Sequence, residues 1–327
     1  MDQPLSRRLI TVPTVVIVFT VVSAGLPFLL FIGLMVDLVR AIVSRRAAMA
    51  SRTVVFLWLY LLGEIVALIA LAAVSWLPSP RRIDITFRLQ AIWAGWTFNS
   101  VRWVFGLEFV AEGLDEVAPA PIVVLARHAS IVDTMLPARY IARANGLALR
   151  YVLKKELLVD PVLDIGGNRL PNHFVDRKSR DLDSEMVAIK ALGADLTARD
   201  GVMIYPEGTR YSEEKRQRYV ASLVRKGGVV GDIASGYRRV LPPRPGGTLA
   251  LLETTTCDVV VLAHRGLEGF ATVRDIWSGD LVGSRIDVRL WRVPRAEIPE
   301  PRSLRVEWLF RLWAEVDDWV SQVRYAE

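Results

Sequence analysis

Cysteine and histidine are scarce in this 327-residue chain, which contains one Cys and three His. The single Cys257 excludes an intramolecular disulfide, and its place before a strand-like run gives no sign of a catalytic thiol. Zinc sites need closely spaced ligands, and His128, His173 and His264 are too scattered to supply them. The sequence therefore predicts neither a disulfide-stabilised fold nor a metal site.

Lysine is also rare: it occurs at only six positions, so 35 of the 41 basic residues are arginine, a bias typical of GC-rich bacterial genomes. Basic residues outnumber the 35 acidic ones, which gives a net charge of +6 and a pI near 9.6. This balance suits an anionic lipid surface or a phosphate-bearing ligand. Nucleic acid is the rival partner, but no recognised nucleic-acid-binding motif supports it.

Two long stretches near the N-terminus lack charge almost entirely. Val12–Val36 has no charged residue, and Thr53–Leu77 has only Glu64. Each is long enough to cross about 30 Å of hydrocarbon. We expect Glu64 to face the partner helix formed by the other apolar stretch, or to be protonated, in a structural role. Flanking arginines are too evenly divided to fix an orientation, so a hairpin that dips into one leaflet is an alternative to two full spans.

An aromatic and basic segment follows the apolar stretches. Trp93, Trp96 and Trp103 recur at helical spacing, as in a helix at the headgroup level, although a core helix would show the same pattern. Residues 111–121, with Gly113 and two prolines, indicate a linker. We therefore expect a membrane-embedded helical hairpin over 1–80, an interfacial segment and linker over 81–118, and a second domain over 119–327.

In the second domain, strand-like and helical segments alternate. Strands are expected at 122–125, 148–153 and 201–205, and helices at 131–145 and 180–196. This order predicts an α/β domain with a largely parallel central sheet and flanking helices. Ligands of such sheets bind at the carboxyl ends of the strands, where His128 and Glu207 are expected.

His128 and Asp133 follow the first of these strands. Five positions apart on one helix, the two side chains would diverge, so they meet only if His128 lies in the turn and Asp133 in the first helical turn. There the carboxylate would orient the imidazole as a general base. Asp133 has a structural alternative, because Ser130 and Asp133 also match a helix N-cap and its capping-box partner.

Two further polar clusters follow along the chain. Tyr205-Pro206-Glu207-Gly208-Thr209-Arg210 combines a strand end, a glycine and a guanidinium, which suits a phosphate but also an ordinary turn. Lys154–Leu157 leads through a glycine-containing loop to Phe174-Val175-Asp176-Arg177, which adds a second guanidinium.

Together these stretches resemble the motifs of the glycerolipid acyltransferase family, the 1-acyl-glycerol-3-phosphate acyltransferases and their lysophospholipid-acylating relatives. His128 to Asp133 is similar to the family's His, four residues, Asp motif, residues 174–177 to its second block, and residues 205–210 to its Pro-Glu-Gly-Thr-Arg block. The likeness runs from about residue 100 to 325 and is greatest to the branch that acylates lysophosphatidate, lysocardiolipin and lysophosphatidylinositol. Residues 258–263 depart from it, because they lack the proline of many relatives' fourth block.

The resemblance implies a glycerolipid acyltransferase fold for residues 119–327 and a role for each matched residue. His128, oriented by Asp133, would deprotonate the free hydroxyl of a lysophospholipid, and the alkoxide would attack the thioester of acyl-CoA or acyl-carrier protein. Backbone N–H groups near Ser130 and Ile131 could assist the oxyanion. The implied phosphate-binding residues are Arg177, Glu207, Gly208, Thr209 and Arg210, with Arg244 and Lys155 as additional candidates.

The family implies no metal and no cofactor beyond the acyl donor as co-substrate. The implied partners are a lysophospholipid, most of all 1-acyl-glycerol-3-phosphate, and membrane lipids, with the catalytic domain at the cytoplasmic face of a bacterial inner membrane. We expect His173 and His264 to be structural. Three alternatives stay open: remodelling of lysocardiolipin or lysophosphatidylinositol, a hydrolase or transacylase with the same dyad, and a non-catalytic lipid-binding membrane protein.

Overall fold

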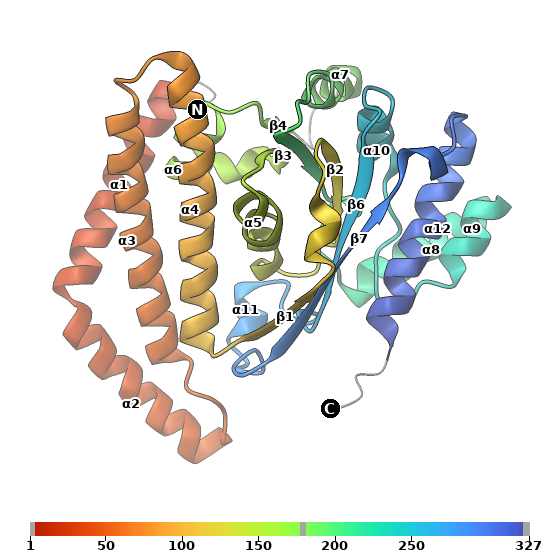
Figure 1. Ribbon diagram of the computed structural model, residues 1–327. Coiled ribbons are helices and arrows are strands. Elements are labelled where there is room, and N and C mark those ends of the chain that lie inside the picture. The colour runs from red at the N-terminus through yellow and green to blue at the C-terminus, as the bar shows by residue number, and fades with distance from the viewer. Residues whose placement is uncertain (1–3, 177–180, 323–327) are drawn as a thin grey trace.

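The computed structural model describes residues 4–176 and 181–322. Four long helices begin the chain: α1 (Pro4–Ala24), α2 (Leu26–Ser44), α3 (Ala50–Val74) and α4 (Ser79–Phe105). In Figure 1 they lie together on one side of the sheet. Among the described residues, α1, α2 and α3 are long and apolar enough to cross a membrane, which indicates that the protein associates with one.

The sequence predicted one helix over the apolar stretch Val12–Val36. In the structure this stretch divides between α1 and α2 at Gly25. Pro27, in the first turn of α2, has no N–H to donate to the preceding helix, so the chain bends there. Pro13 lies inside α1 without ending it. The expected two-helix hairpin is therefore an arrangement of three apolar helices.

The central sheet contains seven strands within the described residues, in the order β1-β7-β6-β2-β5-β3-β4. Neighbouring strands pair in parallel except β6 and β7, which are antiparallel. The expected α/β class and largely parallel sheet are thus confirmed. The strands are β1 (Glu108–Glu112), β2 (Ile122–Ala126), β3 (Ala148–Lys154), β4 (His173–Val175), β5 (Asp200–Ile204), β6 (Asp258–Arg265) and β7 (Arg285–Val293).

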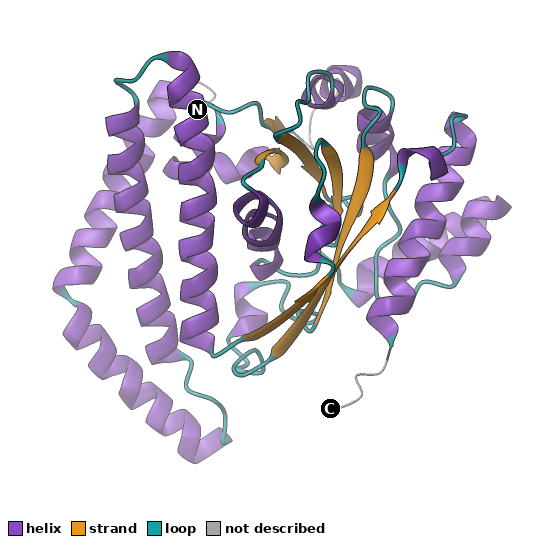
Figure 2. Ribbon diagram, viewed as in Figure 1, coloured by secondary structure: helices purple, strands orange, loops and turns teal. Residues whose placement is uncertain are grey.

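Helices cover both faces of this sheet (Figure 2). Alternate residues of each buried strand point to opposite faces, so β2 sends Val124 into one apolar core and Val123 and Leu125 into the other. The first core includes α4, and the second includes helices from the later part of the chain. The remaining helices are α5 (Arg143–Asn145), α6 (Pro161–Gly167), α7 (Leu182–Gly193), α8 (Glu213–Lys226), α9 (Gly228–Ser235), α10 (Pro245–Leu252), α11 (Val273–Ile276) and α12 (Arg302–Ser321).

Two details differ from the sequence-based prediction. The domain boundary at residue 119 is too late, because β1 pairs with β7 and the supposed linker begins inside the sheet. The helix expected over 131–145 is irregular: a 3-10 turn (Val132–Met135), a π-helical turn (Ala138–Ala142) and α5 succeed one another.

Candidate active site

The residues after β2 form a tight turn around one buried carboxylate. His128 Nδ1 lies 2.8 Å from Asp133 Oδ1, and the Asp133 side chain is fully buried. Asp133 Oδ2 accepts the backbone N–H groups of Ala129 at 2.6 Å and Ser130 at 2.7 Å. Oδ2 thus makes the capping contact of the structural interpretation, and Oδ1 makes the contact with His128 that the catalytic interpretation requires, so the catalytic role stays a prediction.

This geometry defines what the imidazole can do. With its Nδ1–H donated to Asp133, His128 has the lone pair of Nε2 available for a proton. The ring stacks on Tyr205 with 4.4 Å between centroids, and 15% of the side chain is exposed. The ring is thus held in one orientation but is not sealed from a substrate.

A second histidine, His264 on β6, contacts the same carboxylate. Its Nε2 lies 3.2 Å from Asp133 Oδ2, and its side chain is fully buried. Burial alone would raise the pKa of Asp133, but the charges and hydrogen bonds of His128 and His264 outweigh it and lower that pKa below its ordinary value. His264 was expected to be structural, and the pairing of β2 with β6 places its side chain beside Asp133.

Arg127, which the sequence interpretation did not use, fixes the end of β2. Its buried guanidinium donates to the carbonyl of His264 at 2.7 Å, to Glu268 Oε1 at 2.6 Å and to the carbonyl of Arg239 at 2.7 Å. Its full burial, which requires the charge to be paired, is visible only in the structure. It joins the end of β2 to strand β6, to the segment after β6 and to the segment after α9.

Glu207 is placed differently from the expectation that it shapes a phosphate pocket. Its side chain is fully buried, and Oε1 accepts the N–H of His128 at 3.4 Å. Burial raises the pKa of Glu207 to about 8, against the opposing effect of the Arg127 charge. A buried carboxyl group cannot contact a phosphate at the surface. It can hold the His128 loop in place through the hydrogen bond with the His128 N–H.

The other residues of the Pro-Glu-Gly-Thr-Arg turn lie beside Arg244. Gly208 has a φ of 67°, and a Cβ there would come within 3.1 Å of Arg244 Cδ. The Arg244 N–H donates to the Pro206 carbonyl at 2.8 Å, and the guanidinium is exposed beside the Tyr219 ring. The structure therefore brings together the predicted turn and the additional candidate Arg244.

Thr209 and Arg210 continue this turn. The Arg210 guanidinium donates to the Ala271 carbonyl, and Lys215 donates to Thr209 Oγ1 at 3.2 Å. Neither Lys215 nor the Ala271 loop was among the predicted site residues. Cationic groups of Arg210, Lys215 and Arg244 are thus associated with one turn next to His128, whose carbonyl accepts the N–H of Tyr211 at 2.9 Å.

The second block is only partly observable. Arg177 lies outside the described residues, so its predicted role stays a prediction. Asp176, immediately before it, forms an ion pair with Lys155 at 3.2 Å. Lys155 is therefore engaged with the second block.

The backbone donors proposed for the oxyanion need a correction. The N–H of Ser130 is hydrogen-bonded to Asp133 Oδ2, and the Ser130 hydroxyl donates to the Phe270 carbonyl at 2.7 Å. Because the Ser130 N–H already donates to Asp133, it is not available to an oxyanion in this arrangement.

An apolar cavity of about 560 Å³ begins at the same turn. Ile131, Val132 and Met135 line it beside residues of α3, α4 and β3, including Phe56 and Leu153. The cavity was not predicted, because its wall is assembled from segments far apart in the sequence. Its polar members include Tyr60, which donates to Asp160, and Trp93, which donates to Glu64. Glu64 therefore faces α4 and not the other apolar helix of the expected hairpin.

The described residues contain no group of three His, Cys, Asp or Glu side chains placed to hold a metal ion. Residues 108–262 match the family model described as Acyltransferase. No sequence among curated proteins matches the chain.

The structure is similar to the crystal structure of the 1-acyl-sn-glycerophosphate (LPA) acyltransferase, PlsC, from Thermotoga maritima. The TM-score is 0.53 at 14% sequence identity, over 84% of this chain and 100% of that chain, which shows a shared fold. The matched domain and the shared fold agree with the sequence motifs. Residues 108–262 thus match an acyltransferase domain, and the chain has the fold of a glycerolipid acyltransferase.

Proposed function

We propose that the protein transfers a fatty acyl group from acyl-CoA or acyl-carrier protein to the free hydroxyl of 1-acyl-glycerol-3-phosphate, giving phosphatidate. The observation that carries the proposal is the 2.8 Å contact between His128 Nδ1 and a buried Asp133, in a turn whose residues Ile131 and Val132 line an apolar cavity. The paired His128 can act as a general base for a hydroxyl group, and the cavity has room for a hydrocarbon chain.

The reaction needs one proton acceptor and no covalent acyl-enzyme. His128 Nε2 takes the hydroxyl proton of the acceptor while the hydroxyl oxygen bonds to the thioester carbonyl carbon. The tetrahedral intermediate then breaks its C–S bond, and the departing thiolate recovers the proton from the imidazolium. Asp133 stabilises the imidazolium during both steps.

The acceptor phosphate is assigned to the Pro-Glu-Gly-Thr-Arg turn. Arg210 and Arg244 place two guanidiniums on this turn, which is joined to the His128 loop through the Tyr211 N–H. Guanidiniums bind phosphate oxygens through paired N–H donors. Gly208 and Thr209 belong to the same turn, and Arg177 is proposed as a further phosphate contact. Glu207 is proposed to stabilise the turn from its buried position.

The apolar cavity is assigned to an acyl chain. Each methylene group that leaves water for an apolar site contributes about 0.8 kcal/mol, so a long chain gains substantial binding free energy there. Acyl-CoA and acyl-carrier protein are cytoplasmic donors, which supports a catalytic domain at the cytoplasmic face of a bacterial inner membrane.

The test is an assay of purified protein in detergent with labelled acyl-CoA, labelled acyl-carrier protein and a panel of lysophospholipid acceptors. His128→Ala is the catalytic variant. His173→Ala is its matched control, because His173 lies on the edge strand β4 and pairs with Glu185 at 2.6 Å.

Acylation of lysophosphatidate that is lost in His128→Ala and kept in His173→Ala is the expected result. A preference for lysocardiolipin or lysophosphatidylinositol would replace the substrate assignment with phospholipid remodelling. Release of free fatty acid without acceptor would indicate a hydrolase, and transfer from an intact phospholipid would indicate a transacylase. No turnover with any donor and acceptor would refute the enzymatic proposal and favour lipid binding.

A further inference from the structure

One segment of the chain carries its whole net charge. Residues 210–244 contain nine basic and three acidic residues, so their net charge of +6 equals that of the entire protein, and the rest of the chain is balanced. The segment contains α8, α9 and the loops that join them to the Pro-Glu-Gly-Thr-Arg turn and to α10. A charge concentrated in this way indicates an anionic partner. The nine basic residues are Arg210, Lys215, Arg216, Arg218, Arg225, Lys226, Arg238, Arg239 and Arg244.

Much of this charge is not neutralised within the protein. Arg216 pairs with Glu213 on the same helix, and Arg238 pairs with Asp318 of α12 at 3.0 Å. Four other cations of α8 and the loop after α9 are exposed and form no ion pair with any residue that the structure describes. These cations are Arg218, Arg225, Lys226 and Arg239.

Helix α8 presents most of these cations along its length. It extends about 21 Å, and Arg218 and Arg225 lie two turns apart on the same side of it. Val224 and Val229, where α8 meets α9, are each 49% exposed. Spaced cations beside apolar side chains are typical of protein–protein interfaces. The name α8 surface is used below for Arg218, Val224, Arg225, Lys226, Val229 and Arg239.

The α8 surface begins at the candidate active site. Lys215, in the first turn of α8, donates to the Arg210 carbonyl at 2.9 Å. Arg244 donates to the hydroxyl of Tyr219 in the middle of α8 at 2.8 Å, and its guanidinium lies over that ring. An acyl donor bound on α8 would therefore lie beside the turn that contacts the His128 loop.

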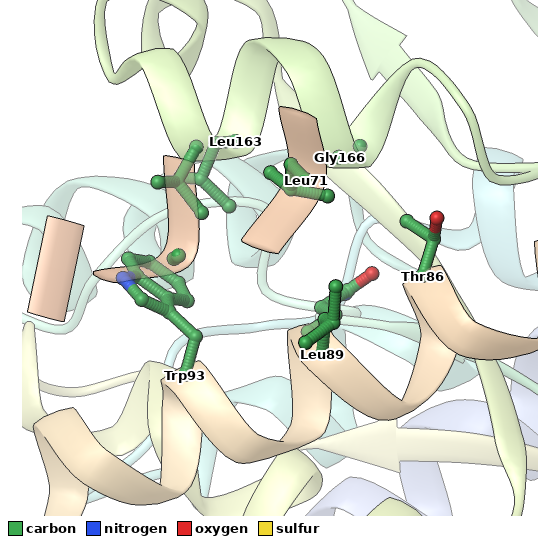
Figure 3. Close-up of a pocket in the computed structure, with 10 residues that line it drawn as sticks. Leu71, Thr86, Leu89, Trp93, Leu163 and Gly166 are labelled. Carbon is green, nitrogen blue, oxygen red and sulfur yellow. The ribbon is translucent and has the colours of Figure 1, made fainter. Parts of the chain in front are cut away.

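The apolar helices lie on the other side of the sheet. In Figure 1, α8 and α9 lie beside α12, and the sheet separates them from α1, α2 and α3. On the side of α3, Leu71 of that helix and Leu89 and Trp93 of α4 surround a small pocket with Leu163 and Gly166 of α6 (Figure 3). A membrane that contacts the apolar helices would therefore lie away from α8. A partner in solution fits the α8 surface better than lipid headgroups do.

We propose that the α8 surface is the docking site of an acidic protein that carries the acyl thioester, an acyl-carrier protein, and that this protein is the acyl donor. CoA is also anionic, but its phosphates belong to one nucleotide, whereas the cations occupy the length of α8 and continue at Arg239. Electrostatic complementarity over such an area guides the encounter of two proteins. The inference rests on the proposed acyl transfer and deepens it by assigning the donor.

The test compares two donors with the same acyl chain, acyl-carrier protein and acyl-CoA, in transfer to lysophosphatidate by the purified protein in detergent. Arg218→Glu/Arg225→Glu reverses two charges of the α8 surface. Arg143→Glu/Arg199→Glu is the matched control, because both arginines are exposed and unpaired among the described residues and the net charge falls equally. Arg218→Lys/Arg225→Lys keeps the charge, and Arg218→Gln/Arg225→Gln replaces the reversal variant if its Tm is lowered.

We expect kcat/KM for acyl-carrier protein to fall roughly 10-fold or more in the reversal variant, and kcat/KM for acyl-CoA to stay within about 2-fold. The lysine variant and the matched control should behave as the wild type with both donors. Added salt should lower the wild-type value for acyl-carrier protein, and the reversal variant should lose most of this dependence. An unchanged value for acyl-carrier protein, or an equal fall with both donors, would overturn the proposal.

A binding measurement separates the docking surface from the proposed reaction. Binding of fluorescent acyl-carrier protein without an acyl chain, measured by anisotropy, needs no turnover. If neither donor supports acylation, the proposed reaction fails, but binding that is roughly 10-fold weaker in the reversal variant still supports the docking surface. Absence of binding to the wild type would overturn it. Loss of binding to anionic phosphatidylglycerol vesicles in the reversal variant, with binding of acyl-carrier protein unchanged, would assign the surface to lipid headgroups and would also overturn it.

Discussion

Replacement of Asp133 by asparagine separates the two roles of this side chain. Oδ1 faces His128 Nδ1, whereas Oδ2 holds the N–H groups of Ala129 and Ser130. An amide has only one acceptor oxygen, and two backbone donors will retain it. The amide NH₂ group then faces His128 Nδ1, which must become an acceptor, so the imidazole proton moves to Nε2 and the base is lost.

The magnitude follows from this change of tautomer. Loss of a positioned general base lowers the rate roughly 10²- to 10⁴-fold, or about 2.7–5.5 kcal/mol of transition-state free energy. The turn keeps its two backbone hydrogen bonds but exchanges a charged acceptor for a neutral one, at a cost of about 1–3 kcal/mol in folding stability. We therefore expect Asp133→Asn to fold and to bind substrates while kcat falls.

The assay is steady-state acylation of lysophosphatidate, with KM and kcat measured separately and Tm measured on the same preparations. His264→Gln is the comparison, because it removes the second imidazole and leaves the His128 contact with Asp133 intact; we expect at most about a 10-fold loss, as for a positioning residue. Asp133→Asn activity within 10-fold of the wild type, with an unchanged Tm, would refute the reasoning.

Three further predictions concern residues around this dyad. The pKa of Glu207 is about 8 in the folded protein against an ordinary 4.5, so its contribution to the free energy of unfolding is complete below pH 4.5 and is lost as pH rises through 8. Between these pH values Glu207→Gln should remove a slope of up to about 1.4 kcal/mol per pH unit from the free energy of unfolding, measured by chemical denaturation. An unchanged slope would contradict the raised pKa of Glu207. Ala94→Phe fills part of the apolar cavity, so kcat/KM should shift toward shorter acyl donors, whereas an unaltered chain-length profile would place the chain elsewhere. Arg210→Gln should raise KM for lysophosphatidate roughly 10-fold or more by losing a charge-assisted phosphate contact, and an equal effect on an acceptor without phosphate would show a structural role instead.

The fold class was predictable because strand and helix segments alternate clearly after Pro121, and the buried strands are continuous apolar runs. The approach of His128 to Asp133 was also predictable, since their spacing allows contact only across a turn. His264 was not, because its neighbour in space is set by the pairing of β2 with β6, which the sequence does not specify. Arg127 was missed because sequence alone does not distinguish a buried guanidinium from an exposed one.

The helical region shows the limit of hydropathy as evidence. The length and composition of Val12–Val36 and Thr53–Leu77 indicate membrane association, but they carry no information on which ends meet the same domain. That information resides in long-range contacts such as Arg7 with Asp164 and Arg40 with Trp277. The bend at Gly25 depends on Pro27, whereas Pro13 does not interrupt α1. The presence of a proline is therefore not enough to locate a bend from the sequence.

In the proposed reaction, the apolar cavity also bears on the competition between water and the lipid acceptor. An imidazole that deprotonates an alcohol can equally deprotonate water, and thioesters hydrolyse readily once a hydroxide is delivered to them. Walls built from residues such as Ile131, Val132 and Met135 offer water few hydrogen-bonding partners next to the reacting carbonyl. Exclusion of water from the cavity would then limit the loss of acyl donor to hydrolysis, and it would matter as much as the strength of the base.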